Sequence, residues 1–260
     1  MLFDTHAHLT WCFDSNTHPA QTPTSDSEID CFLAVSITLA DSAQTLAMAN
    51  GFPGIRSAIG IHPWFIDQSN DTLDDAMQKL SQLVEKQKIT ALGEIGLDKA
   101  RADKTDLGVQ QAWFEAQLKL AVQFDLPVSL HCFKAWNEML RLFKSEAYTS
   151  VRGVMHGFSG GPEMAKQFVD EGFLIGVGPI FLNQNARRYH DTVKAVGVDH
   201  IVLETDAQPN EADPACRQQL SQLTELLEAV SRALSRSRES VEAQVWRNSC
   251  EIFKQANHYE

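Results

Sequence analysis

The sequence predicts a single (β/α)8 barrel, an eight-stranded parallel sheet surrounded by helices. Apolar, β-branched runs alternate with amphipathic helical stretches along the chain, which is typical of βαβ units around a parallel sheet. Eight such runs fit within 260 residues, a length that α/β barrels commonly occupy as one domain. No Gly-rich phosphate loop follows the first run, which disfavours an open doubly wound sheet. We therefore expect one α/β domain over residues 1–260.

The expected strands and helices follow each other in a regular order. The strand candidates are apolar runs at residues 2–9, 32–38, 55–61, 90–95, 127–132, 152–158, 173–177 and 200–204. The helix candidates are amphipathic stretches near residues 40–49, 72–86, 108–124, 135–144, 162–171, 186–196, 214–234 and 238–256. Only the connection after the first strand lacks a clear helix. Residues 11–30 are rich in Ser, Thr, Pro and Asp, so we expect a loop that lines the mouth of the barrel.

The composition is that of an ordinary globular protein. The chain is 43% hydrophobic and 22% charged, and its apolar runs are far shorter than the ~20 residues that span a bilayer. No basic segment followed by an apolar stretch is visible at the start, so we expect no secretory signal and a cytoplasmic location.

Cysteine usage and net charge restrict the function further. The five cysteines are odd in number, widely scattered and without C-x-x-C spacing, so we expect reduced, mostly buried thiols rather than disulfides or a Cys-based zinc site. The net charge of -12 repels polyanions at long range and disfavours nonspecific nucleic-acid binding.

The first ten residues, MLFDTHAHLT, place ionisable groups at alternate positions of a predicted strand. Because side chains alternate between the two faces of a strand, Asp4, His6 and His8 point the same way, toward the barrel axis. Burying three such groups is costly unless they hydrogen-bond densely or bind a charged partner. Two imidazoles two residues apart can converge on one divalent cation, which resolves that cost.

Other predicted strands also end in residues that bind metals. The segments ALGEIGLD, SLHC, VMHGFSG and VLETDA supply Glu94, His131, His156 and Asp206. Each lies near the C-terminal end of a strand, where barrel active sites are built. Taken singly, each has an ordinary structural explanation, such as a hydrogen-bonded histidine or a carboxylate paired with a lysine. Six such residues on five strands favour a metal site, and the mixture of histidines with carboxylates suggests two ions.

The ordered set of motifs resembles a known family. DTHAH on the first strand, GIHP after the third, GEIGLD on the fourth, the histidine of the fifth, HGFSG after the sixth and ETDA after the eighth are similar to the TatD family of metal-dependent hydrolases and deoxyribonucleases, within the amidohydrolase superfamily. The resemblance implies that His6 and His8 hold one divalent ion and that Asp206 completes its site. It further implies that Glu94 bridges two ions and that His131 and His156 hold the second.

The same resemblance implies roles in the reaction. Asp206 would orient a metal-activated water and accept its proton, while Glu94 supports both ions. His62 would face the substrate, although a histidine that caps the strand before Pro63 explains it equally well. Asp4 and Glu204 are expected to orient ligand imidazoles or nearby loops rather than bind metal. The metals expected are Zn, Mg or Mn.

The sequence departs from the family pattern at two places. Many relatives have a basic residue two positions after the histidine of the fifth strand, whereas here Phe133 stands there and Lys134 follows. We expect Lys134 to contact substrate in its place. After GLD, where relatives often have an aromatic residue, the chain has a basic loop at residues 99–104 that either binds phosphate or is simply solvated.

Three functions therefore compete. The first is metal-dependent exonuclease cleavage of single-stranded DNA ends, and the second is hydrolysis of a small amide, ester or lactone. The third, a non-catalytic metal-binding or partner-binding protein, is the least favoured, since an apolar barrel core needs no ligand set. The helices show no sustained heptad pattern, so we expect a monomer with no obligate protein partner and no membrane association.

Overall fold

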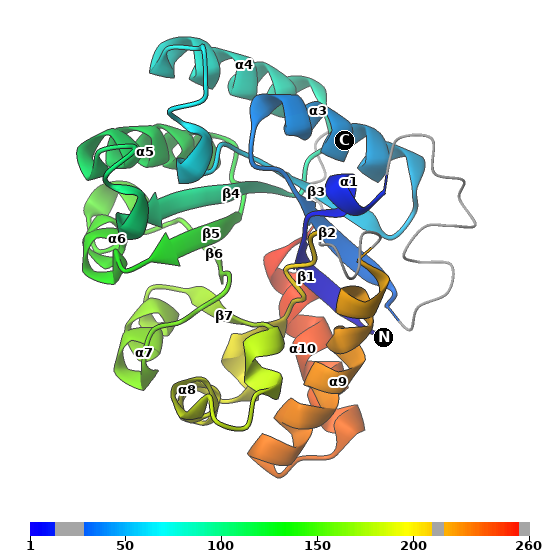
Figure 1. The fold of residues 1–260 in the computed structure, drawn as a ribbon. Helices are drawn as coiled ribbons and strands as arrows, with labels where there is room; N and C mark the ends of the chain where they lie inside the picture. The colour runs from blue at the N-terminus through cyan, green and yellow to red at the C-terminus, as the bar shows by residue number, and fades with distance from the viewer. Residues whose placement is uncertain (14–28, 210–215, 255–260) are drawn as a thin grey trace.

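The protein is an eight-stranded parallel barrel, seen in a computed structural model that describes residues 1–13, 29–209 and 216–254. The strands follow one another around the sheet in chain order (Figure 1). They are β1 (Phe3–Ala7), β2 (Cys31–Val35), β3 (Ile55–Ile59), β4 (Ala91–Asp98), β5 (Val128–Phe133), β6 (Gly153–Met155), β7 (Phe173–Val177) and β8 (Ile201–Leu203). The predicted (β/α)8 architecture is confirmed.

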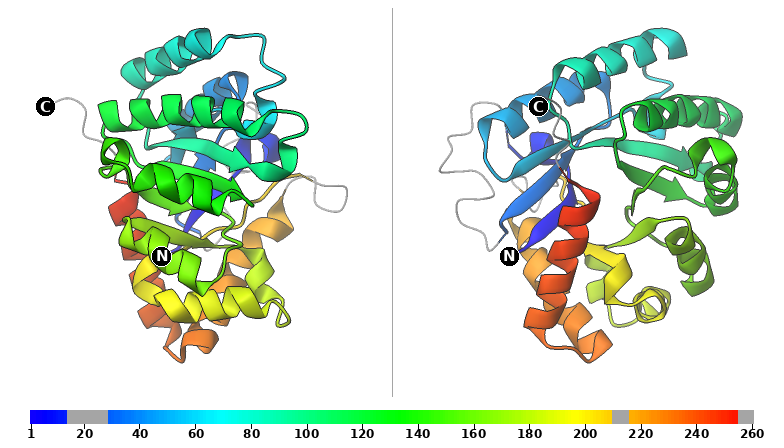
Figure 2. Two further views of the ribbon diagram at one scale, coloured as in Figure 1. Left: turned by 90° about the vertical axis from the view of Figure 1, so that its left-hand side faces the viewer. Right: turned by 180° about the vertical axis from the view of Figure 1, so that it is seen from behind.

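Helices pack around the outside of the sheet, as the two views in Figure 2 show. They are α1 (Leu9–Cys12), α3 (Leu39–Gly51), α4 (Leu73–Lys86), α5 (Leu107–Gln123), α6 (Trp136–Phe143), α7 (Pro162–Asp170), α8 (Arg187–Val196), α9 (Arg217–Leu234) and α10 (Arg238–Ile252). Most of the expected loop at 11–30 lies outside the described residues, as do the ends of two predicted helices at 214–215 and 255–256. Within the described ranges, no helix is both long and apolar enough to cross a membrane.

Short polar residues set the starts of several helices. The hydroxyl oxygens of Thr38, Thr72 and Ser237 each accept a hydrogen bond from the backbone N–H three residues later, at the start of α3, α4 and α10. Such caps satisfy N–H groups that have no partner inside the helix. α7 begins instead with Pro162 at its first position, where the missing N–H costs nothing.

β1 shows how strand alternation separates the core from the barrel interior. Phe3 packs outward against Trp246 and Phe253 at α10, with ring centroids 6.3 and 6.1 Å apart. Asp4 and His6 are fully buried inside the barrel. The period of two along the strand therefore gives an apolar outer layer and a polar interior face.

The barrel closes between its first and last strands. Ala7 and Ala207 form a parallel bridge. The N–H of Asp206 donates to the carbonyl of His6 at 2.8 Å, and the N–H of His8 donates to the carbonyl of Ala207 at 3.0 Å. Closure thus brings the two ends of the ligand set side by side, 200 residues apart in the chain.

The expectation that all five cysteines are reduced is wrong for two of them. Cys12 at the end of α1 and Cys216 at the start of α9 form a disulfide across 204 residues, with Cα atoms 5.6 Å apart. The sequence argument failed because barrel closure, and not sequence spacing, makes these two positions neighbours. Cys31 and Cys132 are buried free thiols, and Cys250 is a partly buried one.

Candidate metal centre

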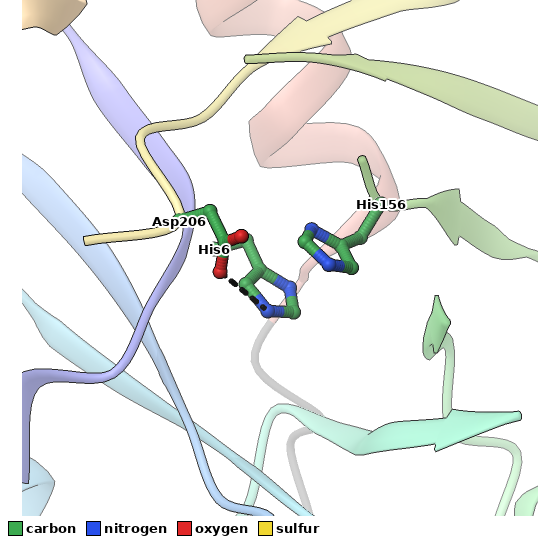
Figure 3. Close-up of side chains that lie close together, drawn as sticks. All are labelled: His6, His156 and Asp206. Carbon is green, nitrogen blue, oxygen red and sulfur yellow. Dashed lines mark ion pairs between the residues drawn. The ribbon is translucent and has the colours of Figure 1, made fainter. Parts of the chain in front are cut away.

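All six predicted metal ligands converge at the C-terminal end of the barrel. They form overlapping groups whose ligand atoms lie within 4.8 Å of one another. Figure 3 shows His6, His156 and Asp206 close together, with His6 on β1 and the other two on the segments that follow β6 and β8. The imidazole rings of His6 and His156 are stacked, with centroids 3.6 Å apart.

Glu94 stands at the centre of this arrangement, and its Oε2 atom faces the histidines of β1. Oε2 lies 3.4 Å from Nε2 of His6 and 3.7 Å from Nε2 of His8. Asp206 joins the same side, with Oδ1 3.4 Å from Nε2 of His8 and 3.9 Å from Nε2 of His6. Two histidines and two carboxylates therefore surround one volume.

The other carboxylate oxygen of Glu94 faces a second group of histidines. Oε1 lies 3.1 Å from Nδ1 of His131 and 3.4 Å from Nε2 of His156. Nε2 of His62 lies 3.3 Å from the same oxygen, so His62 belongs to the cluster itself and not only to the mouth. Its Nδ1 accepts from the N–H of Trp64, at 3.1 Å, which leaves Nε2 to carry the proton and face Glu94.

The spacing and the unsatisfied atoms fit a divalent metal. Two atoms that bind the same tetrahedral ion at ~2.1 Å lie about 3.4 Å from each other. The nitrogen–oxygen distances around Glu94 run from 3.1 to 3.7 Å. Nε2 of His6 is buried without any hydrogen-bond partner, although buried polar atoms are normally bonded. A cation between these atoms accounts for both observations.

Buried ionisable groups in the cluster shift one another's pKa values. Burial by itself would raise the pKa of Glu94, but the surrounding histidines, His62 first, hold that pKa well below its usual range. Burial disfavours the charged form of His156, yet the nearby carboxylates, Glu94 first, raise its pKa to about 10. Burial and the adjacent His156 lower the pKa of His6, which keeps His6 in the neutral form that binds metals.

Two candidate ligand imidazoles are hydrogen-bonded on the side away from Glu94. Nδ1 of His6 lies 2.9 Å from the hydroxyl of Ser129. Nε2 of His131 lies 3.0 Å from Oδ2 of Asp98. Nδ1 of His156 lies 3.4 Å from Oε1 of Glu204, an ion-pair distance without a hydrogen bond. Such partners fix which ring nitrogen faces a metal.

Sequence reasoning missed Ser129 and Asp98, although strand alternation contains the signal for both. Ser129 precedes His131 by two residues on β5, and Asp98 follows Glu94 by four on β4, so each shares the inward face. Asp98 was missed because the fourth strand was predicted to end at residue 95, three residues too early. β4 continues beside β5 because position 96 is glycine: a Cβ there would lie 1.8 Å from the carbonyl oxygen of His131.

The remaining predicted residues lie at different depths. Asp4 is buried below the cluster and accepts hydrogen bonds from the hydroxyl and the N–H of Thr205, at 2.6 and 3.0 Å. Burial raises the pKa of Asp4 to about 7. Glu204 also accepts from the N–H of Gly157 at 2.6 Å. Lys134 is not part of the cluster, and its Nζ lies 5.2 Å from the ring centroid of Phe133.

A cavity of about 260 Å³ opens above the cluster. Its floor is formed by Glu94, His131, His156 and Asp206, and its walls include Trp11 and Trp64. Asp206 is the most accessible of the ligand carboxylates, since 39% of its side chain is exposed, compared with 4% for Glu94. A small molecule or a chain end can therefore reach the cluster from solvent at Asp206.

Comparison with known proteins agrees with this geometry. A family model described as TatD related DNase matches residues 3–254. The chain belongs to the TatD family. This confirms the resemblance that the ordered motifs indicated, from DTHAH to ETDA.

Three similar proteins illustrate the relationship. An uncharacterized metal-dependent hydrolase of Haemophilus influenzae is 30% identical over 96% of this chain and 98% of its own length. The 3'-5' ssDNA/RNA exonuclease TatD of Klebsiella pneumoniae is 30% identical over 67% of this chain and 65% of its own length. The crystal structure of the TatD homologue YjjV from Escherichia coli matches with a TM-score of 0.84 at 25% identity and covers 97% of both chains.

Proposed function

We propose that the protein is a divalent-metal-dependent deoxyribonuclease that removes nucleotides from single-stranded DNA ends. The observation that carries the proposal is the position of Glu94, whose two oxygens face two separate histidine groups at the floor of an open cavity. Membership of the TatD family, with a relative named as a single-strand exonuclease, supports the choice of phosphodiester hydrolysis.

The donor set supports two ion positions. His6, His8 and Asp206 would hold one ion, His131 and His156 would hold the other, and Glu94 would contribute one oxygen to each. Zn²⁺, Mg²⁺ and Mn²⁺ are the candidates, since a mixed histidine and carboxylate site suits several divalent ions. Ions bound there supply Lewis-acid neutralisation of phosphate charge and acidify a water molecule.

Asp206 is the candidate general base. It is the ligand carboxylate with the largest exposed area, and one oxygen faces His8 while the side chain reaches the cavity. A carboxylate in this position can accept a proton from an attacking water. Glu94 is too deeply buried for that task, so its role is to hold both histidine groups at a fixed separation.

Other residues near the cavity would contact the substrate. His62 presents its ring beside Glu94 and lines the cavity wall. Burial lowers the pKa of His62 to about 4, so it acts as a neutral hydrogen-bonding group. Lys134 follows the last residue of β5 and would supply a positive charge for phosphate at the rim. A monomer and a cytoplasmic location remain predictions.

A second candidate function is hydrolysis of a small amide, ester or lactone. The net charge of -12 and the presence of Phe133 where many relatives carry a basic residue favour an uncharged substrate. The same donor set would serve either reaction, because a carbonyl oxygen and a phosphoryl oxygen are polarised in the same way.

A substrate panel separates the two functions. Metal-free protein is reloaded with Mg²⁺, Mn²⁺ or Zn²⁺ and given single-stranded DNA, duplex DNA, RNA, a small phosphodiester, an amide and an ester. We expect chelator-sensitive shortening of single-stranded DNA. Asp206→Asn should lower kcat on the order of 10²- to 10⁴-fold, the usual contribution of a general base.

The control variant for this panel is Asp199→Asn. Asp199 is exposed in the turn before β8, so the variant removes one carboxylate away from the cluster and should keep full activity. Circular dichroism of both variants checks that the fold is intact. Turnover of only the amide or the ester would refute the nuclease proposal, and full activity of Asp206→Asn would refute the assigned base.

A further inference from the structure

Large apolar side chains are exposed around the mouth of the barrel. In the described part of the chain, Trp11, Trp64, Phe133 and Ile180 are 41, 43, 39 and 46% exposed. They lie just after or at the end of β1, β3, β5 and β7, so all four belong to the end of the barrel that carries the cluster. Trp11 and Trp64 also line the cavity above the cluster. Exposed apolar groups gathered at one place mark binding sites.

Both tryptophan rings are held in place by residues of the cluster. The indole of Trp11 stacks on the imidazole of His8, with centroids 5.0 Å apart and planes 19° from parallel. Nε1 of Trp64 donates a hydrogen bond of 2.6 Å to Asp98, and the indole meets His62 edge to face at 5.3 Å. Rings that are already oriented lose little conformational entropy when a ligand binds.

Cationic side chains accompany the aromatic rings at the rim. The guanidinium carbon of Arg101 lies 5.5 Å from the ring of Trp64. Nε of Arg101 is buried and has no hydrogen-bond partner. Nζ of Lys134 lies 5.2 Å from the ring centroid of Phe133. Single-stranded nucleic acids bind where aromatic rings for the bases lie beside positive groups for the phosphates.

We infer that Trp11 and Trp64 form a stacking site for the terminal base of a single-stranded nucleic acid, so that the last phosphodiester lies over the cluster. This inference rests on the proposed nuclease function. An unpaired base has a free π-face, which a base within a duplex does not offer. A small aliphatic amide or ester has no group that would use two oriented indoles.

The acidic net charge makes local contacts decisive for binding. With a net charge of -12, long-range attraction of a polyanion is absent, so affinity must come from local contacts. Stacking of a base on an aromatic side chain supplies such a contact and tolerates every base. Binding should therefore depend on the end of the strand and only weakly on its sequence or length.

The test compares an intact oligonucleotide with one that is abasic at its terminal nucleotide. Binding is measured by fluorescence anisotropy in the presence of chelator, so that no turnover occurs, and kcat/KM is measured after metal is restored. We expect the wild-type protein to prefer the intact end on the order of 10-fold, since loss of one base–aromatic stack weakens binding by about that factor. Because both oligonucleotides use the same cluster, the ratio of their affinities or of their kcat/KM values cancels any effect that a substitution has on the cluster itself.

Variants assign this preference to the two rings. Trp11→Leu and Trp64→Leu should each reduce the ratio toward one, and Trp11→Phe and Trp64→Phe should retain part of it. The matched control is Val122→Ala, which removes an exposed apolar group from α5 and should keep the wild-type ratio. Circular dichroism confirms that each variant is folded.

Two negative outcomes are distinguishable. Equal binding and cleavage of intact and abasic ends by the wild type, or leucine variants that keep the full ratio, would overturn the stacking site while leaving the nuclease function intact. Failure to cleave any oligonucleotide with any of the three metals would refute the nuclease function, and the stacking inference would fall with it.

Discussion

Individual side chains at this centre lie in pairs, in which one candidate ligand contacts one group that orients it. Asp98 is the clearest example, since its Oδ2 atom meets Nε2 of His131 at 3.0 Å and also accepts from Nε1 of Trp64 at 2.6 Å. Nδ1 of His131 consequently faces Glu94. A carboxylate behind a ligand histidine fixes the tautomer and raises the basicity of the other nitrogen.

Asp98→Asn should weaken divalent-ion binding at the proposed His131 position about 10- to 100-fold, the usual effect of removing such a partner. Competition with a chromogenic metal indicator measures the affinity directly, without any substrate. Asp103→Asn is the control, because Asp103 is exposed in the loop that follows β4. If Asp98→Asn and the wild-type protein released metal at the same indicator concentration, the positioning role of Asp98 would be wrong.

One helix, α5, supports the ends of two strands that carry the site. Gln117 binds both backbone groups of Ile61, accepting from its N–H at 2.8 Å and donating to its carbonyl at 3.1 Å. Gln110 does the same for Asp98, at 2.8 and 3.0 Å. Residues seven apart lie on one face of a helix. α5 therefore supplies hydrogen bonds next to His62 and at Asp98, at the mouth of the barrel.

Gln117→Met keeps the side-chain length but leaves the N–H and the carbonyl of Ile61 buried without these partners. An unsatisfied buried polar group costs about 1–3 kcal/mol, so the free energy of unfolding in urea should fall by that amount. Gln123→Met is the matched control, since Gln123 is exposed at the end of the same helix. Equal urea midpoints for the two variants would contradict the supporting role of Gln117.

Two kinds of connection close the barrel at the junction of its first and last strands. Hydrogen bonds join β1 to the segment after β8, and the disulfide between Cys12 and Cys216 joins the helices that follow them. Both connections lie beside the cluster, because Cys12 follows His8 by four residues and Asp206 lies in the segment before Cys216. Closure of the barrel therefore places the first and last candidate ligands of the chain side by side.

Breaking the disulfide should destabilise the fold. A cross-link over 204 residues lowers the entropy of the unfolded chain by an amount worth about 5 kcal/mol in the loop-closure model. Cys12→Ser combined with Cys216→Ser, or reduction of the wild-type protein, should lower the urea midpoint. Reductant should leave the double variant unchanged, and Cys250→Ser should keep the wild-type response. Five titratable thiols in the unfolded, unreduced protein, instead of the three free cysteines, would contradict the bond.

Local patterns predicted most of the architecture and named the six candidate ligands that the fold brings together. Alternation of strand and helix signals predicted the barrel, and the period of two along DTHAH placed His6 and His8 on one inward face. The helix starts were predicted to within about three residues, because capping groups and apolar spacing act over a few residues. Strand ends were less certain: β4 runs to Asp98 and β6 stops at Met155, since pairing with neighbouring strands decides where a strand ends.

What the chain encodes locally is therefore the choice of elements and the chemical types of the ligands, since both depend on residues close together in sequence. Contacts between distant segments decided the rest. The pairing of Cys12 with Cys216 exists only where the first and last strands meet. The support of Asp98 by Gln110 depends on how α5 packs on β4, and the joint contact of His62 and His131 with Glu94 depends on the pairing of β3, β4 and β5. No local pattern contains these distances, because they depend on the tilt and register of the whole sheet.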